Sequence, residues 1–282
     1  MNSSLKLIEF KGLEAVVIKA ASGAEAIVSR VGAQVLSWKT PDGKERLFLS
    51  DKAVFDGSRA IRGGIPVCFP QFSGLGALPK HGLLRQKPWS WAEQAGRGEF
   101  ALVCLTSGDD DATQTLWPHA FQAELTVVLE GARLDVELAI ENTGTQSFEF
   151  TAALHSYLRV NEVEKTHLQG LQGLEYRDAA HGNVLRKDTA LELVVEDEVD
   201  RVYHDVKKPL LLSEGDRNLG INTEGFPDVV VWNPWETLCA TLPDMDRLDF
   251  RRMLCVEAAA AKRPVLLPAG ETWVGRQSLV AV

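Results

Sequence analysis

The chain has few cysteines for its 282 residues. There are four, Cys68, Cys104, Cys239 and Cys255, with no C-x-x-C pair and no zinc-like spacing to histidine. We therefore expect reduced cysteines buried in apolar segments. A chain of this length can bury a full hydrophobic core without disulfides or structural metals.

Basic residues are also in deficit. Lysine and arginine number 30 against 39 aspartates and glutamates, which gives a formal net charge of −9. This balance argues against a nucleic-acid partner, because nucleic-acid-binding proteins normally carry a basic surface. An acidic protein can still bind an anionic small molecule where a few arginines converge, since arginine pairs with phosphate in bidentate fashion.

Long apolar segments are absent as well. No apolar run approaches the ~20 residues that cross a bilayer, so we expect no membrane partner. The segment Met1–Phe10 lacks the basic start and apolar centre of a signal peptide, which predicts a cytoplasmic protein. No coiled-coil or edge signature forces a dimer, so we expect a monomer.

Helical periodicity is missing too, and strand patterns dominate. Residues Phe121–Glu130 and Arg133–Glu141 flank the short Gly131-Ala132 turn, and apolar residues alternate with polar ones in the second arm. Further strand-like segments are Leu13–Lys19, Ala24–Ser29, Phe100–Thr106, Phe148–Tyr157, Leu191–Val195, Val229–Trp232, Pro264–Leu267 and Trp273–Val282. Many short strands between turns predict an all-β, antiparallel sandwich or barrel with little helix.

No linker, internal repeat or low-complexity segment divides the chain, so we expect one domain over residues 1–282. The region from Gly57 to Pro88 is rich in proline and glycine and contains no clear strand pattern. A structureless stretch of this length inside a compact domain is usually functional.

Two titratable residues lie in apolar, strand-like segments. His155 follows Phe148–Leu154, and Glu257 lies between Met-Leu-Cys-Val and a run of alanines. Burial retunes the pKa of such groups, which makes them candidates for acid–base chemistry. A single histidine in this context is more often a hydrogen-bonded core residue, whereas a buried carboxylate needs a partner or a purpose.

Cationic residues gather in the Gly57–Pro88 region. Arg62, His81 and Arg85 could hold an anion, or they could tie loop carbonyls together. Asp200 could accept hydrogen bonds from substrate hydroxyls or pair with Arg201 on the surface. Together, a proton donor, a proton acceptor and an arginine cluster suggest acid–base chemistry on a charged, polyhydroxylated substrate.

Six motifs in order then define a resemblance. They are Arg62-Gly-Gly-Ile-Pro-Val-Cys-Phe-Pro-Gln-Phe72, Lys80-His-Gly-Leu-Leu-Arg85, Ala153-Leu-His-Ser-Tyr157, Val199-Asp-Arg-Val-Tyr203, Val231-Trp-Asn-Pro234 and Met253-Leu-Cys-Val-Glu257. This set closely resembles the aldose 1-epimerase superfamily, in particular its glucose-6-phosphate 1-epimerase (hexose-6-phosphate mutarotase) branch. The likeness runs from about Val31 to Gly270.

The resemblance implies one large antiparallel β-sandwich of the galactose-mutarotase type, with a hexose 6-phosphate as small-molecule substrate and neither a metal nor an organic cofactor. His155 matches the general acid of the family and Glu257 the general base. The positions that line its sugar-phosphate site correspond to Arg62, His81, Arg85 and Asp200. The family usually has Phe-Gly where this chain has Phe72-Ser73, and His-Gly-Phe-Ala-Arg where it has His81-Gly-Leu-Leu-Arg85.

The residue types agree with mutarotation. Exchange of α and β hemiacetals requires removal of the 1-hydroxyl proton and protonation of the ring oxygen, followed by rotation of the open aldehyde. A carboxylate suits the first task, and histidine can give and recover a proton near neutral pH. Two alternatives remain: a non-catalytic sandwich that binds sugar phosphates, and an epimerase of unphosphorylated aldoses. Phe72, Trp232 and Trp235 could stack against a sugar face, although aromatic residues in such segments more often belong to the core.

Overall fold

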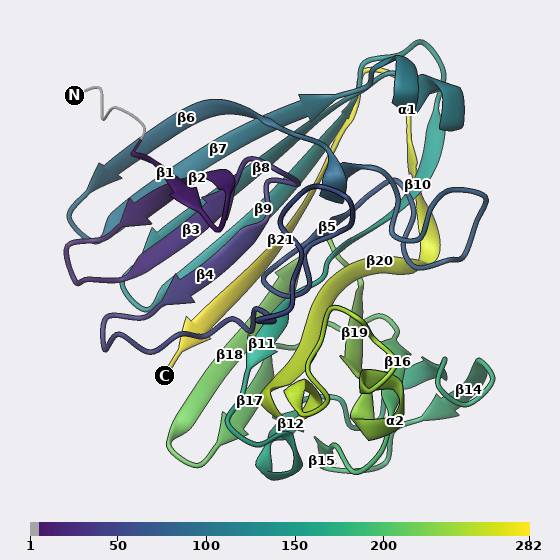
Figure 1. Ribbon diagram of the computed structural model, residues 1–282. Helices are drawn as coiled ribbons and strands as arrows, with labels where there is room; N and C mark the ends of the chain where they lie inside the picture. Colours follow the sequence, from purple (N-terminus) through teal and green to yellow (C-terminus); the bar gives the residue numbers. More distant parts are fainter. Residues whose placement is uncertain (1–5) are drawn as a thin grey trace.

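The computed structural model describes residues 6–282 and is built mainly of antiparallel strands arranged in three sheets (Figure 1). This confirms the prediction of an all-β fold with little helix.

The expectations of one domain and of a monomer stay predictions. Residues 1–5, which begin the Met1–Phe10 segment, lie outside the described residues. No helix in the described part is long and apolar enough to cross a membrane.

The nine-stranded sheet forms the largest layer, and the predicted hairpin lies within it. Its strands run in the order β15-β12-β17-β18-β21-β9-β8-β7-β6. Their bounds are β6 Ser90–Arg97, β7 Phe100–Gly108, β8 Phe121–Glu130, β9 Arg133–Asn142, β12 His167–Gln169, β15 Glu192–Val194, β17 Leu210–Glu214, β18 Arg217–Glu224 and β21 Thr272–Ala281. The β8–β9 register pairs Glu130 with Arg133 across the predicted turn.

The eight-stranded sheet carries the site described below. Its order is β14-β13-β16-β19-β20-β10-β5, and β11 also pairs with β20. The bounds are β5 Val67–Cys68, β10 Phe148–Leu154, β11 Tyr157–Arg159, β13 Glu175–Asp178, β14 Val184–Lys187, β16 Val199–Tyr203, β19 Asp228–Asn233 and β20 Met253–Leu267. The Phe148–Tyr157 segment, expected as one strand, is therefore interrupted at His155 and Ser156, whereas β20 runs unbroken along both pieces.

A four-stranded sheet and a few short helices complete the fold. The sheet runs in sequence order through β1 Leu7–Phe10, β2 Leu13–Lys19, β3 Glu25–Ser29 and β4 Val35–Lys39. The helices are α1 Asp111–Leu116, α2 Trp235–Cys239 and three 3₁₀ turns, η1 Leu84–Gln86, η2 Val163–Lys165 and η3 Asp249–Arg252.

One large hydrophobic core joins the three sheets, with members from β2, β8, β9, β10 and β20. On β9 the alternating residues Leu134, Val136, Leu138 and Ile140 are all buried, as their spacing predicts. All four cysteines are buried and free, which confirms that expectation.

The alternation of the eight-stranded sheet separates this core from the site. On β19, Val229 and Val231 belong to the large core, whereas Val230 packs on the opposite face with Phe72. On β20, Val256 and Ala258 belong to the core as well, so Glu257 between them points away from it. One face of this sheet is thus structural, and the other is free to form a binding site.

A glycine lets the Gly57–Pro88 region approach the sheets closely. Gly64 has a φ of +62°, and a Cβ added to it would lie 2.1 Å from the carbonyl oxygen of Val35. Any side chain at this position would push the Arg62-Gly63-Gly64 segment away from β4.

We predict that Gly64→Ala destabilises the protein by about 1–3 kcal/mol more than Gly131→Ala does. Gly131 is a matched control, because its φ of +56° is similar but a Cβ there meets nothing within 4 Å. Urea unfolding of both variants measures the difference. Equal losses of stability would show that the close approach at Gly64 is not required.

Candidate active site

A cavity of about 280 Å³ opens on the free face of the eight-stranded sheet, and Val230 forms part of its floor. All six site residues predicted from the sequence line it. They are Arg62, His81, Arg85, His155, Asp200 and Glu257. They come from the Gly57–Pro88 region, from β16, from the β10–β11 break and from β20, so the fold gathers residues up to 195 positions apart, from Arg62 to Glu257.

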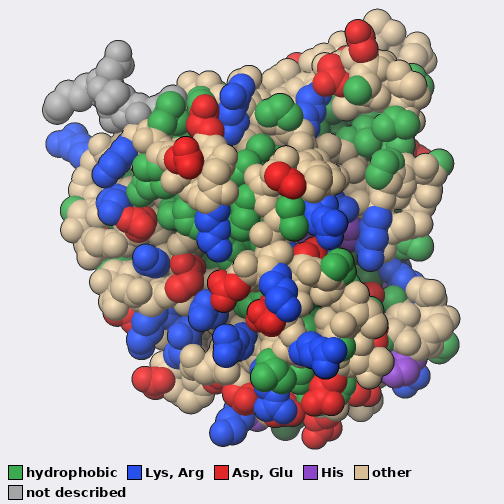
Figure 2. Space-filling model, viewed as in Figure 1, with side chains coloured by type: hydrophobic (Ala, Val, Ile, Leu, Met, Phe, Trp, Pro, Cys, Tyr) green, Lys and Arg blue, Asp and Glu red, His purple; other side chains and the backbone are tan. Residues whose placement is uncertain are grey.

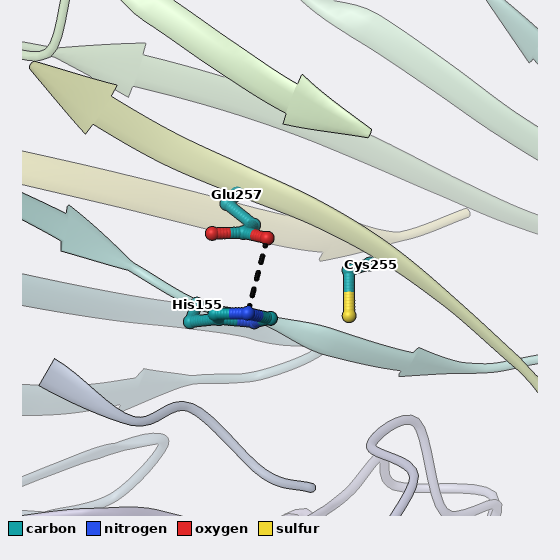
Figure 3. A group of neighbouring side chains, drawn as sticks. All are labelled: His155, Cys255 and Glu257. Carbon is teal, nitrogen blue, oxygen red and sulfur yellow. Dashed lines mark ion pairs between the residues drawn. The ribbon is translucent and has the colours of Figure 1, made fainter. Parts of the chain in front are cut away.

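His155 and Glu257 face each other across neighbouring strands. The β10–β20 register pairs Leu154 with Ala258, and the β11–β20 register pairs Tyr157 with Cys255, so His155 in the break lies opposite Glu257. Its Nε2 is 3.3 Å from Glu257 Oε1 (Figure 3). Both side chains are buried, with Glu257 only 1% exposed.

A hydrogen-bonded glutamine from the other sheet holds this break in place. Gln277 on β21 accepts a hydrogen bond from the Ser156 hydroxyl and donates one from Nε2 to the Val256 carbonyl, at 2.5 and 2.9 Å. The His155 backbone N–H donates to Pro66 O at 2.9 Å. Hydrogen bonds thus fix the backbone of both segments that carry the pair, the β10–β11 break and β20.

Burial moves the pKa values of the pair in opposite directions. Loss of solvent, helped by the nearby Asp200 carboxylate, raises the pKa of Glu257 well above its usual range. Burial, helped by the nearby charges of Arg62 and Arg85, lowers the pKa of His155 well below its usual range. Both shifts favour the uncharged forms, so the free protein holds a carboxyl and a neutral imidazole that share one proton between them.

Both members of the pair keep a free hydrogen-bonding atom. Within residues 6–282, Glu257 Oε2 and His155 Nδ1 have no hydrogen-bond partner although both are buried. A buried polar atom without a partner costs about 1–3 kcal/mol. Such atoms are expected where a ligand supplies the missing partner.

Aromatic rings surround the imidazole of His155. The Tyr157 ring stacks on it at 4.7 Å between centroids, and the His81 ring meets it edge-on at 5.2 Å. Trp232 contacts both His155 and Tyr157 and lines the cavity, as Phe72 does. Phe72 and Trp232 therefore pack on the hydrophobic core and line the cavity as well. Trp235 does not line the cavity and packs against Phe250.

His81 is held as a neutral hydrogen-bond donor. Burial and the neighbouring cations, Arg85 first among them, lower its pKa to about 3. The Ser73 backbone N–H donates to His81 Nδ1 at 3.3 Å, which assigns the ring proton to Nε2. Ser73 itself has a φ of 55°, a backbone conformation that favours glycine, the residue that the family resemblance implies at this position.

The two arginines differ in how their charge is compensated. Arg62 donates from Nη1 to the Tyr157 hydroxyl at 3.0 Å, and its Nη2 is 3.2 Å from an Asp244 carboxylate oxygen. Arg85 donates from Nη2 to the Lys80 carbonyl at 2.7 Å and has no carboxylate within 4.0 Å among residues 6–282. The Nε of each arginine is buried without a partner in the same part of the chain.

A smaller space of about 180 Å³ adjoins the first and shares Arg62, Arg85, His155 and Tyr157 with it. Both arginines therefore border the two spaces, and so does His155.

Asp200 belongs to the cavity and not to a surface ion pair. Burial raises its pKa, against the opposing charges of Arg177 and Lys80. Its suggested partner Arg201 lies instead 3.9 Å from Asp188 and donates to the Tyr203 hydroxyl at 3.3 Å. The alternative that Asp200 pairs with Arg201 is therefore wrong.

The cavity is positively charged although the protein is acidic. Its lining includes four cations, Arg62, Lys80, Arg85 and Arg177, against two acidic residues, Asp200 and Glu257. The face of the molecule in Figure 2 shows acidic and basic side chains intermixed. This local excess of cations suits an anionic ligand.

Sequence reasoning missed several residues that the structure brings into the cavity. They are Lys80, Tyr157, Arg177 and Trp232, together with Asp244, which fixes Arg62. Lys80 lies beside His81 and Tyr157 lies two residues after His155, each within one of the six motifs, so the sequence did carry a signal for both. Arg177 had none, because β13 enters the site only through its pairing with β16.

Comparison with known proteins agrees with this geometry. The model of the aldose 1-epimerase family matches residues 14–280. A relative from Cenchrus ciliaris, provisionally named a glucose-6-phosphate 1-epimerase, is 36% identical over 96% of this chain and 85% of its own length. A relative of the same provisional name from Escherichia coli K12 is 30% identical over 82% of this chain and 78% of its own length.

Solved structures give the same assignment of fold. A protein from Salmonella typhimurium, described as a provisional mutarotase, superposes with a TM-score of 0.91 at 25% identity and covers 100% of this chain and 96% of its own. A galactose mutarotase-like protein from Clostridium acetobutylicum superposes with a TM-score of 0.78 at 16% identity, over 100% and 99% of the two chains.

The fold is therefore that of the galactose-mutarotase-like sandwiches, with a cavity for a small-molecule sugar. The chain belongs to the aldose 1-epimerase family, and it is a sugar epimerase of the mutarotase type.

The raised pKa of Glu257 predicts how Glu257→Gln changes stability with pH. At about pH 4 the carboxyl is protonated in both folded and unfolded chains. Above the ordinary value of 4.5 the unfolded chain ionises and the folded one does not, so this group's contribution to wild-type stability is lost as pH rises toward the folded pKa.

The stability of Glu257→Gln relative to wild type should consequently increase between about pH 4 and 7 in urea unfolding. Glu149→Gln on β10, whose side chain is exposed, is the control, and its difference from wild type should change little. A pH-independent difference for Glu257→Gln would contradict the raised pKa.

Proposed function

We propose that the protein interconverts the α and β anomers of glucose 6-phosphate or a related hexose 6-phosphate, without a cofactor. The observation that carries the proposal is the buried His155–Glu257 pair at 3.3 Å, beside two arginines whose Nε donors lack partners within residues 6–282. An acid, a base and anion-binding donors meet in one cavity, as this reaction needs.

In the proposed reaction Glu257 is the base and His155 the acid. The proton that the pair shares moves to the imidazole, and the carboxylate takes the proton of the sugar 1-hydroxyl through its free Oε2. The imidazolium protonates the ring oxygen as the C1–O5 bond breaks. The open aldehyde then rotates about C1–C2, and reclosure on its other face returns both protons, so no net proton is gained or lost.

The electrostatics of the cavity support these roles. A carboxylate with a raised pKa is a stronger base than one in water, and an imidazolium with a lowered pKa is a stronger acid. Because the proton starts between the two groups, neither needs to exchange with solvent during the reaction. The reverse step uses the same groups with the same transfers reversed.

The remaining cavity residues have binding roles in the proposal. Arg62 and Arg85 bind the phosphate through guanidinium N–H groups, with Asp244 holding Arg62 in position. His81 donates from Nε2 to a sugar oxygen, and Asp200 accepts from a sugar hydroxyl.

We predict that Glu257→Gln slows anomer exchange of glucose 6-phosphate by about 10²–10⁴-fold, because the amide cannot take the 1-hydroxyl proton. Exchange NMR at equilibrium measures the rate after subtraction of the spontaneous reaction. The control is again Glu149→Gln, which lies on β10 outside the cavity. Wild-type exchange rates in Glu257→Gln would remove the base from the mechanism.

A second prediction separates phosphorylated from plain sugars. Arg85→Ala should lower kcat/KM for glucose 6-phosphate by about 10- to 100-fold, the value of a charged hydrogen bond of 1.5–3 kcal/mol, and should leave exchange of glucose nearly unchanged. Arg263→Ala is the control, since this arginine pairs with Asp205 outside the cavity. Equal losses on both sugars would favour the epimerase of unphosphorylated aldoses.

The non-catalytic sandwich is the remaining alternative, and binding measured beside turnover separates it. Calorimetric titration with glucose 6-phosphate should show saturation in the same concentration range in which NMR shows accelerated exchange. Saturable binding without any acceleration would favour a sensor of sugar phosphates and would contradict the proposed reaction.

A further inference from the structure

Cys255 is a buried thiol beside the acid–base pair, and the proposed reaction does not use it. It lies two residues before Glu257 on β20, so both side chains project from the same face of the strand. Figure 3 shows the two pointing toward the strand of His155. One ligand atom from each of the three residues lies within 4.8 Å of the other two.

This set has the chemistry of a zinc site. Imidazole nitrogen, thiolate sulfur and carboxylate oxygen bind Zn²⁺ at about 2.0–2.3 Å in tetrahedral geometry. The 3.3 Å between His155 Nε2 and Glu257 Oε1 suits two ligands of one such ion. Mg²⁺ and Ca²⁺ prefer all-oxygen ligands, so this set discriminates against them.

The burial and charge of the three residues point the same way. All are at least nine-tenths buried, and Glu257 Oε2 and His155 Nδ1 have no hydrogen-bond partner within residues 6–282. A neutral imidazole, a thiol and a carboxyl carry no net charge. One divalent cation that replaces the thiol and carboxyl protons leaves the net charge at zero, so the desolvated site gains no unpaired charge.

We propose that His155, Cys255 and Glu257 bind Zn²⁺ or a cation of similar softness, and that the bound ion excludes the sugar. His155 and Glu257 line the cavity, so the open fourth position of the ion faces the space that a substrate needs. The ion binds His155 Nε2 and Glu257 Oε1, between which the shared proton moves in the proposed reaction, so it is a competitor and not a cofactor.

Metal binding can be measured without any sugar, which keeps this proposal separate from the proposed function. We expect wild-type protein to bind one Cd²⁺ per chain with the ultraviolet absorption of a cadmium–thiolate bond, and Zn²⁺ to displace it. Ca²⁺ and Mg²⁺ should not displace it. Binding without the thiolate absorption, or no binding, would overturn the assignment whatever the protein does to sugars.

Cys255→Ser tests the ligand set directly, and Cys104→Ser is its matched control. Cys104 is also buried, but it lies on β7 of the nine-stranded sheet and outside the group. Cys255→Ser should bind Zn²⁺ at least about 100-fold more weakly than wild type. Loss of a residue that only hydrogen-bonds to a metal ligand costs about 10- to 100-fold, so a larger loss indicates a direct ligand. The Zn²⁺ affinity of Cys104→Ser should stay within about 2-fold of wild type. Equal affinities in the two variants would overturn the proposal.

A competition experiment tests the consequence for the site. Glucose 6-phosphate should raise the apparent Kd of the wild-type protein for Zn²⁺ by a factor of one plus the ratio of the sugar concentration to its own Kd. Zn²⁺ affinity that is independent of saturating sugar phosphate, measured on protein shown to bind that sugar, would place the ion elsewhere and contradict mutual exclusion.

Discussion

The contact between His155 and Glu257 is the interaction on which the rest of the site depends. Two ionisable groups are buried on one sheet face at 3.3 Å, and neither would be tolerable there alone and charged. Together they can remain uncharged by sharing a proton, which avoids the free-energy cost of burying a charge. In the proposed reaction, the same arrangement keeps a base of raised pKa in contact with an acid of lowered pKa.

The fold supplies this contact through a local irregularity. Continuous pairing of β10 with β20 would hold position 155 within a regular ladder, whereas the break between β10 and β11 frees His155 to stack on Tyr157. Gln277 stabilises the break from the opposite sheet by bonding to Ser156 and Val256. The free face then closes with the Gly57–Pro88 region, which packs closely because Gly64 has no side chain.

Strand pattern predicted much of the fold, because alternation along β8 and β9 reports directly which side chains are buried. The break at His155 was not predictable, since an apolar run does not reveal an interruption. The six site residues came from a resemblance in motifs, and the structure brings all of them into one cavity. Arg177 was not predicted, because strand order decides which residues line the same cavity and sequence periodicity does not encode it.

In the proposed reaction His155 and Glu257 act as one proton-transferring unit, and a double-mutant cycle tests this coupling most directly. Anomer exchange of glucose 6-phosphate is measured by NMR for wild type, His155→Gln, Glu257→Gln and the double variant. If the groups form one unit, the double variant is about as slow as either single variant, because the first loss already disables the other group. If the two groups act independently, the fold-losses in rate of the two single variants multiply in the double variant. That result would contradict the account.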